Sequence, residues 1–148
     1  MIRASLLLSL PLLAGCGLTE TEARRPTDLS RSCPPDLAGL QNELFAERCG
    51  GSGCHGTDQP TYDLDLVSPD LARRVVNVPA MGCPGELLVV PGHPERSVLY
   101  LKIAEDLPKC GVRMPLGGAR VGANAVGCVA AWIRALPPSP VDAGADAP

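Results

Sequence analysis

Two cysteines and a histidine lie close together in the first half of the chain. Cys49 and Cys54 are separated by four residues, and His55 follows Cys54 directly. Thiols can pair as a disulfide, bind a metal ion or attach a ligand covalently, and imidazole is a common metal ligand. Three of the four intervening residues are glycines, whose left-handed conformations allow a loop of this length to fold back.

A methionine lies in a predicted loop later in the chain. Met114 is followed by Pro115, and glycines lie on both sides of it, which argues against a regular helix or strand. A methionine that only fills the core would more often lie at apolar spacing on a helix face. Met81 is also in a predicted loop and is the second candidate of this kind.

These motifs together resemble class I cytochromes c, whose usual haem motif has two residues between the cysteines rather than four. The resemblance implies one haem c bound covalently through Cys49 and Cys54. It also implies His55 and Met114 as the axial ligands of the iron. A bound macrocycle would supply apolar bulk to a chain that has only four aromatic side chains.

Other ligand sets stay open. His93 or Met81 could take the place of Met114, although His93 precedes Pro94 and is predicted at a helix cap. A zinc site could use the two cysteines of the motif together with His55 and His93, but the chain offers no second ligand pair at zinc-finger spacing. A local Cys49–Cys54 disulfide would also suit an oxidising compartment.

Seven cysteines are present, and the one at Cys16 is assigned to lipid. The six that remain are an even number, as in the disulfide frameworks of exported domains. If Cys49 and Cys54 bind haem, the other four can form two disulfides with three possible connectivities. Of these we expect Cys83–Cys110 and Cys33–Cys128.

The amino terminus predicts export and lipidation. Residues 1–15 contain Arg3 and a leucine-rich run that is shorter than the roughly 20 apolar residues of a membrane span. The run ends in Leu13-Ala14-Gly15-Cys16, which resembles a bacterial lipobox and implies lipidation of Cys16. Because Gly17 is not acidic, we expect anchoring to the outer membrane, on its periplasmic or surface face.

The composition divides the rest of the chain. Residues 16–32 are polar and are predicted to be a tether, residues 33–136 a single domain, and residues 137–148 a disordered tail rich in Pro, Ala and Asp. The net charge is −3 and lysine occurs at only two positions, so nucleic acid is not an expected partner.

Two amphipathic helices are predicted at the ends of this domain. Residues 36–48 place leucines and Phe45 at helical spacing and lead directly into Cys49. Residues 123–136 place Val129 and Ile133 on one face, with Trp132 beside them, and Pro137 stops the helix. A helix, a Cys-Cys-His motif, a Met-Pro loop and a last helix follow one another as in class I cytochromes c.

Shorter elements are predicted between these helices. They are a strand over residues 62–66, a helix starting near residue 68 and running to Val75, an apolar run over residues 86–90, and a helix over residues 94–104. The stretch around residues 90–100 also resembles cytochrome c-like domains of predicted bacterial lipoproteins. The expected fold is mainly α, with long loops, some short strands and disulfides.

The resemblance implies an electron carrier and not an enzyme. An iron with both axial positions filled passes single electrons, so the implied partners are other redox proteins that bind transiently to a monomer, and a redox sensor would look the same. The alternative is a disulfide-stabilised structural or binding lipoprotein without haem. That alternative does not explain why His55 follows Cys54 directly.

Overall fold

The computed structural model describes residues 32–34 and 36–138 of the chain. The predicted signal segment, Cys16, the tether up to residue 31 and the tail from residue 139 lie outside the described residues. No helix in the described part is long and apolar enough to cross a bilayer. The described residues include nearly all of the predicted domain.

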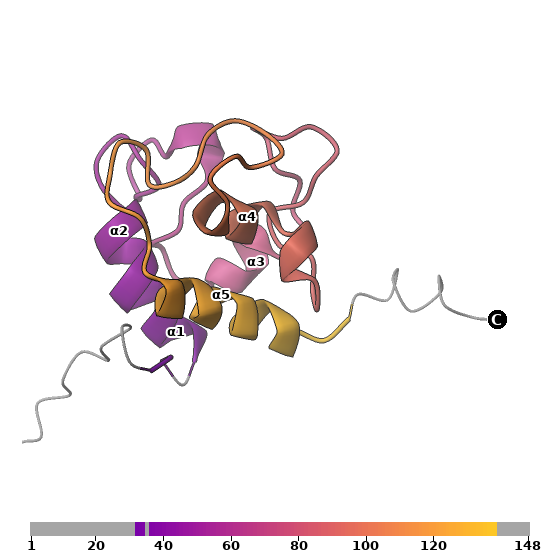
Figure 1. Cartoon of the computed structure of the whole chain (residues 1–148). Coiled ribbons are helices and arrows are strands. Elements are labelled where there is room, and N and C mark those ends of the chain that lie inside the picture. The colour runs from indigo at the N-terminus through magenta and orange to yellow at the C-terminus, as the bar shows by residue number, and fades with distance from the viewer. Residues whose placement is uncertain (1–31, 35, 139–148) are drawn as a thin grey trace, which may run out of the picture.

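The described part is helix-rich (Figure 1). The helical elements are α1 (Leu37–Leu40), a π-helical turn (Gln41–Ala46), α2 (Glu47–Cys49), a 3₁₀ turn (Thr61–Asp63), α3 (Leu71–Val75), a second 3₁₀ turn (Pro94–Arg96), α4 (Val98–Ala104) and α5 (Ala123–Ala135). The mainly helical prediction is therefore confirmed.

One continuous helical stretch runs from α1 through the π-helical turn to α2, where an amphipathic helix was predicted. The Asp36 carboxylate accepts a hydrogen bond from the backbone N–H of Gly39 at 2.8 Å and caps the first turn. The apolar face is buried, with Leu44 and Phe45 no more than 3 % exposed. The stretch ends at Cys49, so it places the first cysteine of the motif at the edge of the core.

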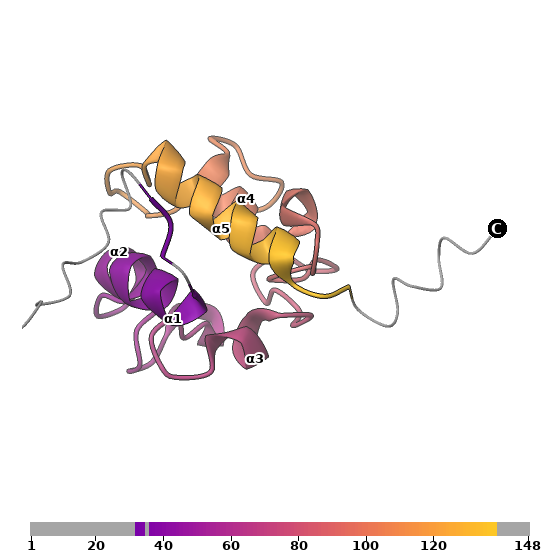
Figure 2. The ribbon, with the colours of Figure 1, turned by 90° about the horizontal axis from the view of Figure 1, so that it is seen from below.

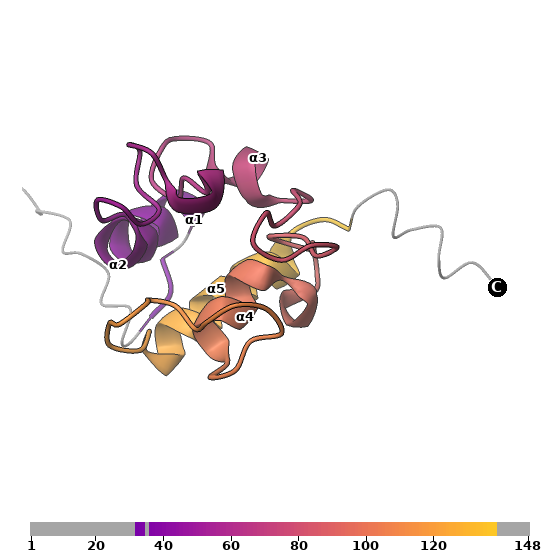
Figure 3. The same ribbon diagram turned by 90° about the horizontal axis from the view of Figure 1, so that it is seen from above.

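The helix α5 lies against α4 and α1. Figure 3 shows α4 and α5 side by side, and in the view from below α5 lies nearest with α4 behind it (Figure 2). Val129 and Ile133 of α5 are fully buried, as their spacing predicted, and the helix ends at Ala135, before Pro137. The burial of this face explains why the longest helix of the described residues forms here.

Two disulfides join segments that are far apart in sequence. Cys33–Cys128 connects the segment before α1 to α5, with 5.2 Å between the Cα atoms. Cys83–Cys110 connects the loop after α3 to the loop after α4, with 5.7 Å between the Cα atoms. Both expected pairings are present, and each disulfide stabilises the fold by typically about 2–4 kcal/mol because it constrains the unfolded chain.

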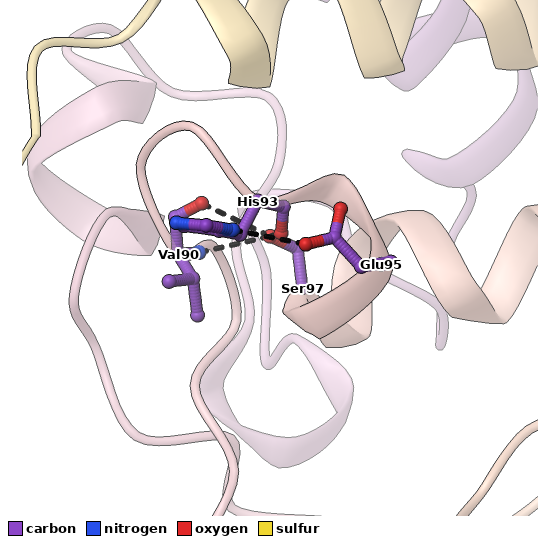
Figure 4. Close-up of polar contacts among 4 residues, drawn as sticks. All are labelled: Val90, His93, Glu95 and Ser97. Carbon is purple, nitrogen blue, oxygen red and sulfur yellow. Dashed lines mark hydrogen bonds and ion pairs between the residues drawn. The ribbon is translucent and has the colours of Figure 1, made fainter.

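The helix predicted over residues 94–104 is interrupted at Ser97. This residue is extended, with a ψ of 114°, and it forms a parallel β-bridge with Leu87. Its buried hydroxyl accepts a hydrogen bond from the N–H of Val90 at 2.9 Å and donates to the carbonyl of His93 at 2.8 Å (Figure 4). These partners satisfy the polar groups at the break, so the chain can leave the helical conformation here.

The strand predicted over residues 62–66 is wrong. Tyr62 and Asp63 have left-handed backbone conformations, with φ of 57° and 54°, and belong to a 3₁₀ turn. Across residues 32–34 and 36–138 the β-structure consists of isolated bridges: Val76 with Val89, Pro79 with Leu87, and Leu87 with Ser97. The short strands of the expected fold are thus reduced to single bridged pairs.

Candidate functional site

The loop that follows α2 brings Cys49, Cys54 and His55 together through backbone hydrogen bonds. The N–H of His55 donates to the carbonyl of Cys49, and the N–H of Cys54 donates to the carbonyl of Gly51, both at 2.9 Å. A Cβ atom at Gly50 would lie 2.5 Å from Cγ2 of Val67, so the close approach of these two segments requires glycine at this position.

The two thiols of the motif are free and lie in different environments. Cys49 is half-buried and Cys54 is exposed, and no disulfide joins them. Burial raises the pKa of the Cys49 thiol from 9.0 to about 11; the Arg48 guanidinium lowers it and Cys54 raises it further. Cys49 is therefore a neutral thiol at physiological pH.

His55 is half-buried and its ring is oriented by a backbone carbonyl. Nδ1 lies 3.2 Å from the carbonyl oxygen of Leu64, an atom that can only accept, so Nδ1 carries the proton of this bond. Burial lowers the pKa of His55, and the backbone at Leu64 and Thr61 offsets part of that effect. A neutral ring with its proton on Nδ1 keeps its lone pair on Nε2, the state in which imidazole binds a metal.

The segment that presents Leu64 is held by its own Asp65 and by two side chains from neighbouring elements, Gln41 and Arg74. Gln41 is buried in the π-helical turn, and its amide nitrogen lies 3.2, 2.7 and 2.6 Å from the carbonyl oxygens of Leu66, Val67 and Ser68. The Asp65 carboxylate accepts hydrogen bonds from the N–H groups of Val67 and Ser68 at 2.7 and 2.9 Å. The pKa of Asp65 is lowered, because these bonds outweigh the opposing effect of burial.

Arg74 of α3 is the third of these side chains. Its guanidinium donates to the carbonyl of Asp65 at 3.2 Å and also to the carbonyls of Ser68 and Pro69. We call residues 49–69 the histidine segment. Its backbone carbonyls are thus satisfied from both the first helical stretch and α3, which keeps the carbonyl of Leu64 in place beside the ring of His55.

A cavity of about 510 Å³ lies between these elements, within the roughly 300–1,000 Å³ range of small-molecule and cofactor sites. Its wall is predominantly apolar. The side chains that line it include Phe45, Cys49, His55, Tyr62, Asp63, Arg74, Met81, Lys102, Val112 and Met114. The exposed fractions of Tyr62 and Met81, 63 % and 65 %, mean that the cavity reaches the protein surface.

Met114 lines this cavity from the loop that follows α4. We call residues 105–118 the methionine segment; in Figure 1 it is part of the orange loop between α4 and α5. The side chain of Met114 is half-buried against the core, and its N–H donates to the carbonyl of Lys102 at 2.7 Å. Met81 lines the same cavity from the loop bridged by Cys83–Cys110.

His93 is not brought to the cavity. Its Nδ1 lies 2.9 Å from a carboxylate oxygen of Glu95, in the turn before α4 (Figure 4). Among the described residues, no group of three or more His, Cys, Asp or Glu side chains could hold a metal ion, so the zinc set of the cysteine motif with His93 is not assembled. The nearby Ser97 is fully buried and bonded to backbone, which excludes it as an accessible nucleophile.

Of the predicted site residues, Cys49, His55, Met81 and Met114 lie around one cavity, whereas Cys54 is exposed outside its lining. Sequence reasoning missed Gln41, Arg74 and Lys102. Gln41 had a signal, because it is a polar residue on the apolar face of a predicted helix.

Comparison with protein-family models, with curated proteins and with solved structures gives no match for this chain. The fold and the site therefore define only a class: a small helix-rich domain with two disulfides built around an apolar cavity that a histidine, a cysteine and two methionines share.

Proposed function

We propose that this chain is an electron-transfer haem c lipoprotein with one haem attached through Cys49 and Cys54. His55 and Met114 are the axial ligands of the iron in this proposal. The main support for this proposal is that His55 and Met114, which are 59 positions apart in sequence, line the same cavity of about 510 Å³. Imidazole and thioether are the ligand pair of cytochromes c.

The residues present fit such a group at several points. The wall is mostly apolar, as a macrocycle requires, and the neutral Cys49 thiol lies in it. His55 has its proton directed to the carbonyl of Leu64, which leaves Nε2 as the ligating nitrogen.

When bound, the haem supplies reversible one-electron transfer between its two iron oxidation states. The mostly apolar wall would shield the group, and His55 and Met114 would both be used to hold the iron, which suits electron transfer rather than substrate chemistry. Tyr62, Met81 and Val112 line the cavity and are more than half exposed, so the cavity opens to the surface where a partner redox protein can approach transiently.

Attachment to a membrane is part of the same proposal. Lipidation of Cys16 would hold the domain at the outer membrane through two or three acyl chains, which anchor far more firmly than one. We propose no nucleic-acid partner and a monomeric protein that meets other redox proteins one at a time.

The alternative function is a disulfide-stabilised structural or binding lipoprotein without haem. The exposed position of Cys54 outside the cavity lining is the observation that favours it. In this function, the two bridges Cys33–Cys128 and Cys83–Cys110 stabilise a receptor whose apolar cavity takes another ligand.

The two functions differ in whether the chain carries a covalently bound haem. The full chain is purified from a periplasm that matures cytochromes c, then denatured, and its pyridine haemochrome spectrum is recorded. The proposed function predicts about one haem per chain that stays with the denatured protein. Protein without covalent haem, with Cys49 and Cys54 recovered as a disulfide, would support the alternative instead.

A further inference from the structure

Lys102 lines the cavity and donates hydrogen bonds to backbone carbonyls of the methionine segment. It belongs to α4 and is one of only two lysines in the chain. Its ammonium group donates to the carbonyl of Val112 at 3.1 Å and to the carbonyl of Cys110 at a shorter distance. The carbonyl of the same residue accepts from the N–H of Met114 at 2.7 Å. A single residue thus binds the methionine segment at three points.

The backbone of the methionine segment is shaped to accept this ammonium group. Gly111 has a φ of +61°, and a Cβ atom there would lie 2.6 Å from Nζ of Lys102. A side chain at position 111 would therefore push the ammonium group away from the carbonyls of its two neighbours. Partial burial lowers the pKa of Lys102, because the charged ammonium group loses some of its hydration there.

Charge-assisted hydrogen bonds of this kind are stronger than neutral ones. The Cys83–Cys110 disulfide fixes one end of the same backbone, but Met114 lies four residues beyond Cys110 and needs a second attachment. The contacts of Lys102 with Val112 and Met114 lie in the middle and at the far end of that interval.

We propose that Lys102 is a positioning residue for Met114, because its ammonium group holds residues 110–112 against α4 and so keeps the thioether at the cavity. This role rests on the proposed function, in which Met114 is a ligand of the iron. Lys102 itself does not bind the iron.

The test compares three variants of the full haem-loaded chain. Lys102→Met keeps the alkyl stem and removes the donors, and Lys102→Arg restores a cation with donors. Lys109→Met removes an equal charge from the methionine segment itself. Lys109 is paired with Glu86 on the surface and does not line the cavity, so it is a matched control for charge alone.

We expect Lys102→Met to retain covalent haem but to lose most of the sulfur-to-iron absorption band. Carbon monoxide competes with Met114 for ferrous iron and should bind this variant about tenfold more tightly, because a charge-assisted attachment is lost. Lys102→Arg should recover most of the band, and Lys109→Met should keep it. Lys102→Gln, which adds no thioether to the cavity, carries the same expectation and also serves if Lys102→Met does not fold.

An unchanged band and unchanged carbon monoxide affinity in both Lys102→Met and Lys102→Gln would overturn the positioning role while leaving the haem proposal intact. Equal losses in Lys109→Met would also overturn it, because the effect would then be one of net charge. Absence of covalent haem from the unsubstituted protein would refute the proposed function, and with it the ligand role of Met114.

Hydrogen exchange on the haem-free protein tests the positioning role of Lys102 separately from the haem proposal. Lys102→Met should speed amide exchange at residues 111–114 and leave α5 unchanged, whether or not haem is ever attached. Equal exchange in both proteins would show that Lys102 does not hold the segment.

Discussion

The histidine segment and the methionine segment line the same cavity, but they are fixed to the rest of the molecule by different contacts. Gln41, Asp65 and Arg74 satisfy a run of carbonyl and N–H groups in the histidine segment, from both the first helical stretch and α3. Around Met114 the methionine segment is held by Lys102 and the Cys83–Cys110 disulfide, and its other attachments include the exposed ion pairs Lys109–Glu86 and Asp106–Arg120.

This difference predicts that Met114 is more easily displaced from the iron than His55. The imidazole of His55 is oriented by the carbonyl of Leu64. Several side-chain hydrogen bonds hold the backbone around that carbonyl, so the ring should move little when one of them is lost. Met114 depends on few attachments, so each of them should have a visible effect on its bond to iron. We therefore expect loss of a supporting contact in the histidine segment to alter stability, and loss of one in the methionine segment to alter the spectrum and the potential.

The largest effect is expected from His55→Ala. It removes the ligand on the braced side of the cavity, so we expect loss of the low-spin haem spectrum and little or no reversible electron transfer. Absorption spectroscopy and voltammetry measure both. His93→Ala is the control, because His93 is paired with Glu95 away from the cavity, and it should behave as the unsubstituted protein. If His93→Ala lost the low-spin spectrum and His55→Ala kept it, His93 would be the ligand instead.

Met114→Ala is expected to have the next largest effect. The haem should stay attached, but the sulfur-to-iron band should be lost and the reduction potential should fall, because a thioether ligand raises the potential. The potential is measured by spectroelectrochemical titration. Met81→Ala serves as the control, since Met81 lines the same cavity but is 65 % exposed. If Met81→Ala loses the band and Met114→Ala keeps it, the two methionines exchange roles.

Gln41→Leu tests the bracing of the histidine segment. The buried carbonyl of Leu66 and the part-buried carbonyl of Val67 lose their side-chain donor, whereas that of Ser68 keeps Arg74, so the free energy of unfolding should fall by about 1–3 kcal/mol. Denaturant unfolding measures this change. The sulfur-to-iron band of the haem-loaded variant should be unchanged. Asn42→Ala, an exposed position in the same helical turn, should change stability far less. A lost band with unchanged stability would contradict the comparison.

The smallest expected effect is a pH dependence that comes from Cys49. In haem-free protein the folded thiol has a pKa of about 11 against 9.0 for an unperturbed thiol, so it holds its proton longer than the unfolded chain does. This contribution to stability is complete below pH 9.0. It falls by at most about 1.4 kcal/mol per pH unit as the pH rises from there through the folded pKa.

Denaturant unfolding at a series of pH values measures this loss, with Cys49→Ser as the variant that lacks it. In haem-loaded protein the sulfur would be a thioether and could not titrate, so the dependence should disappear. An identical pH dependence in both forms would mean that Cys49 is not attached to the haem.

The long amphipathic helices could be predicted from sequence because local spacing and stop signals determine them. The π-helical turn, the break at Ser97 and the left-handed Tyr62 could not, because each depends on partners elsewhere in the chain. Ser97, for example, pairs with Leu87 and bonds to Val90. Alternation of apolar and polar residues at residues 62–66 predicts a strand. The first of these residues instead belong to the 3₁₀ turn Thr61–Asp63, whose first N–H, that of Thr61, donates to the carbonyl of Cys54 at 2.7 Å.

The candidate site was predictable in its chemically distinctive residues and not in its supports. Cys49, His55 and Met114 were identified by motif and loop context, and they line one cavity. Lys102 lacked a signal, because a lysine on an amphipathic helix usually extends into solvent. Its role follows from the path of the methionine segment, which is a property of the folded chain.

The covalent state of the motif is the most direct test of the central claim. Trypsin cleaves after Arg48 and Arg73, with no arginine or lysine between them, so a single peptide carries Cys49, Cys54 and His55. The haem proposal predicts that mass spectrometry finds this peptide with one haem added and no alkylatable thiol. The same peptide at its unmodified mass with two alkylatable thiols, or with a Cys49–Cys54 disulfide, would contradict the proposal.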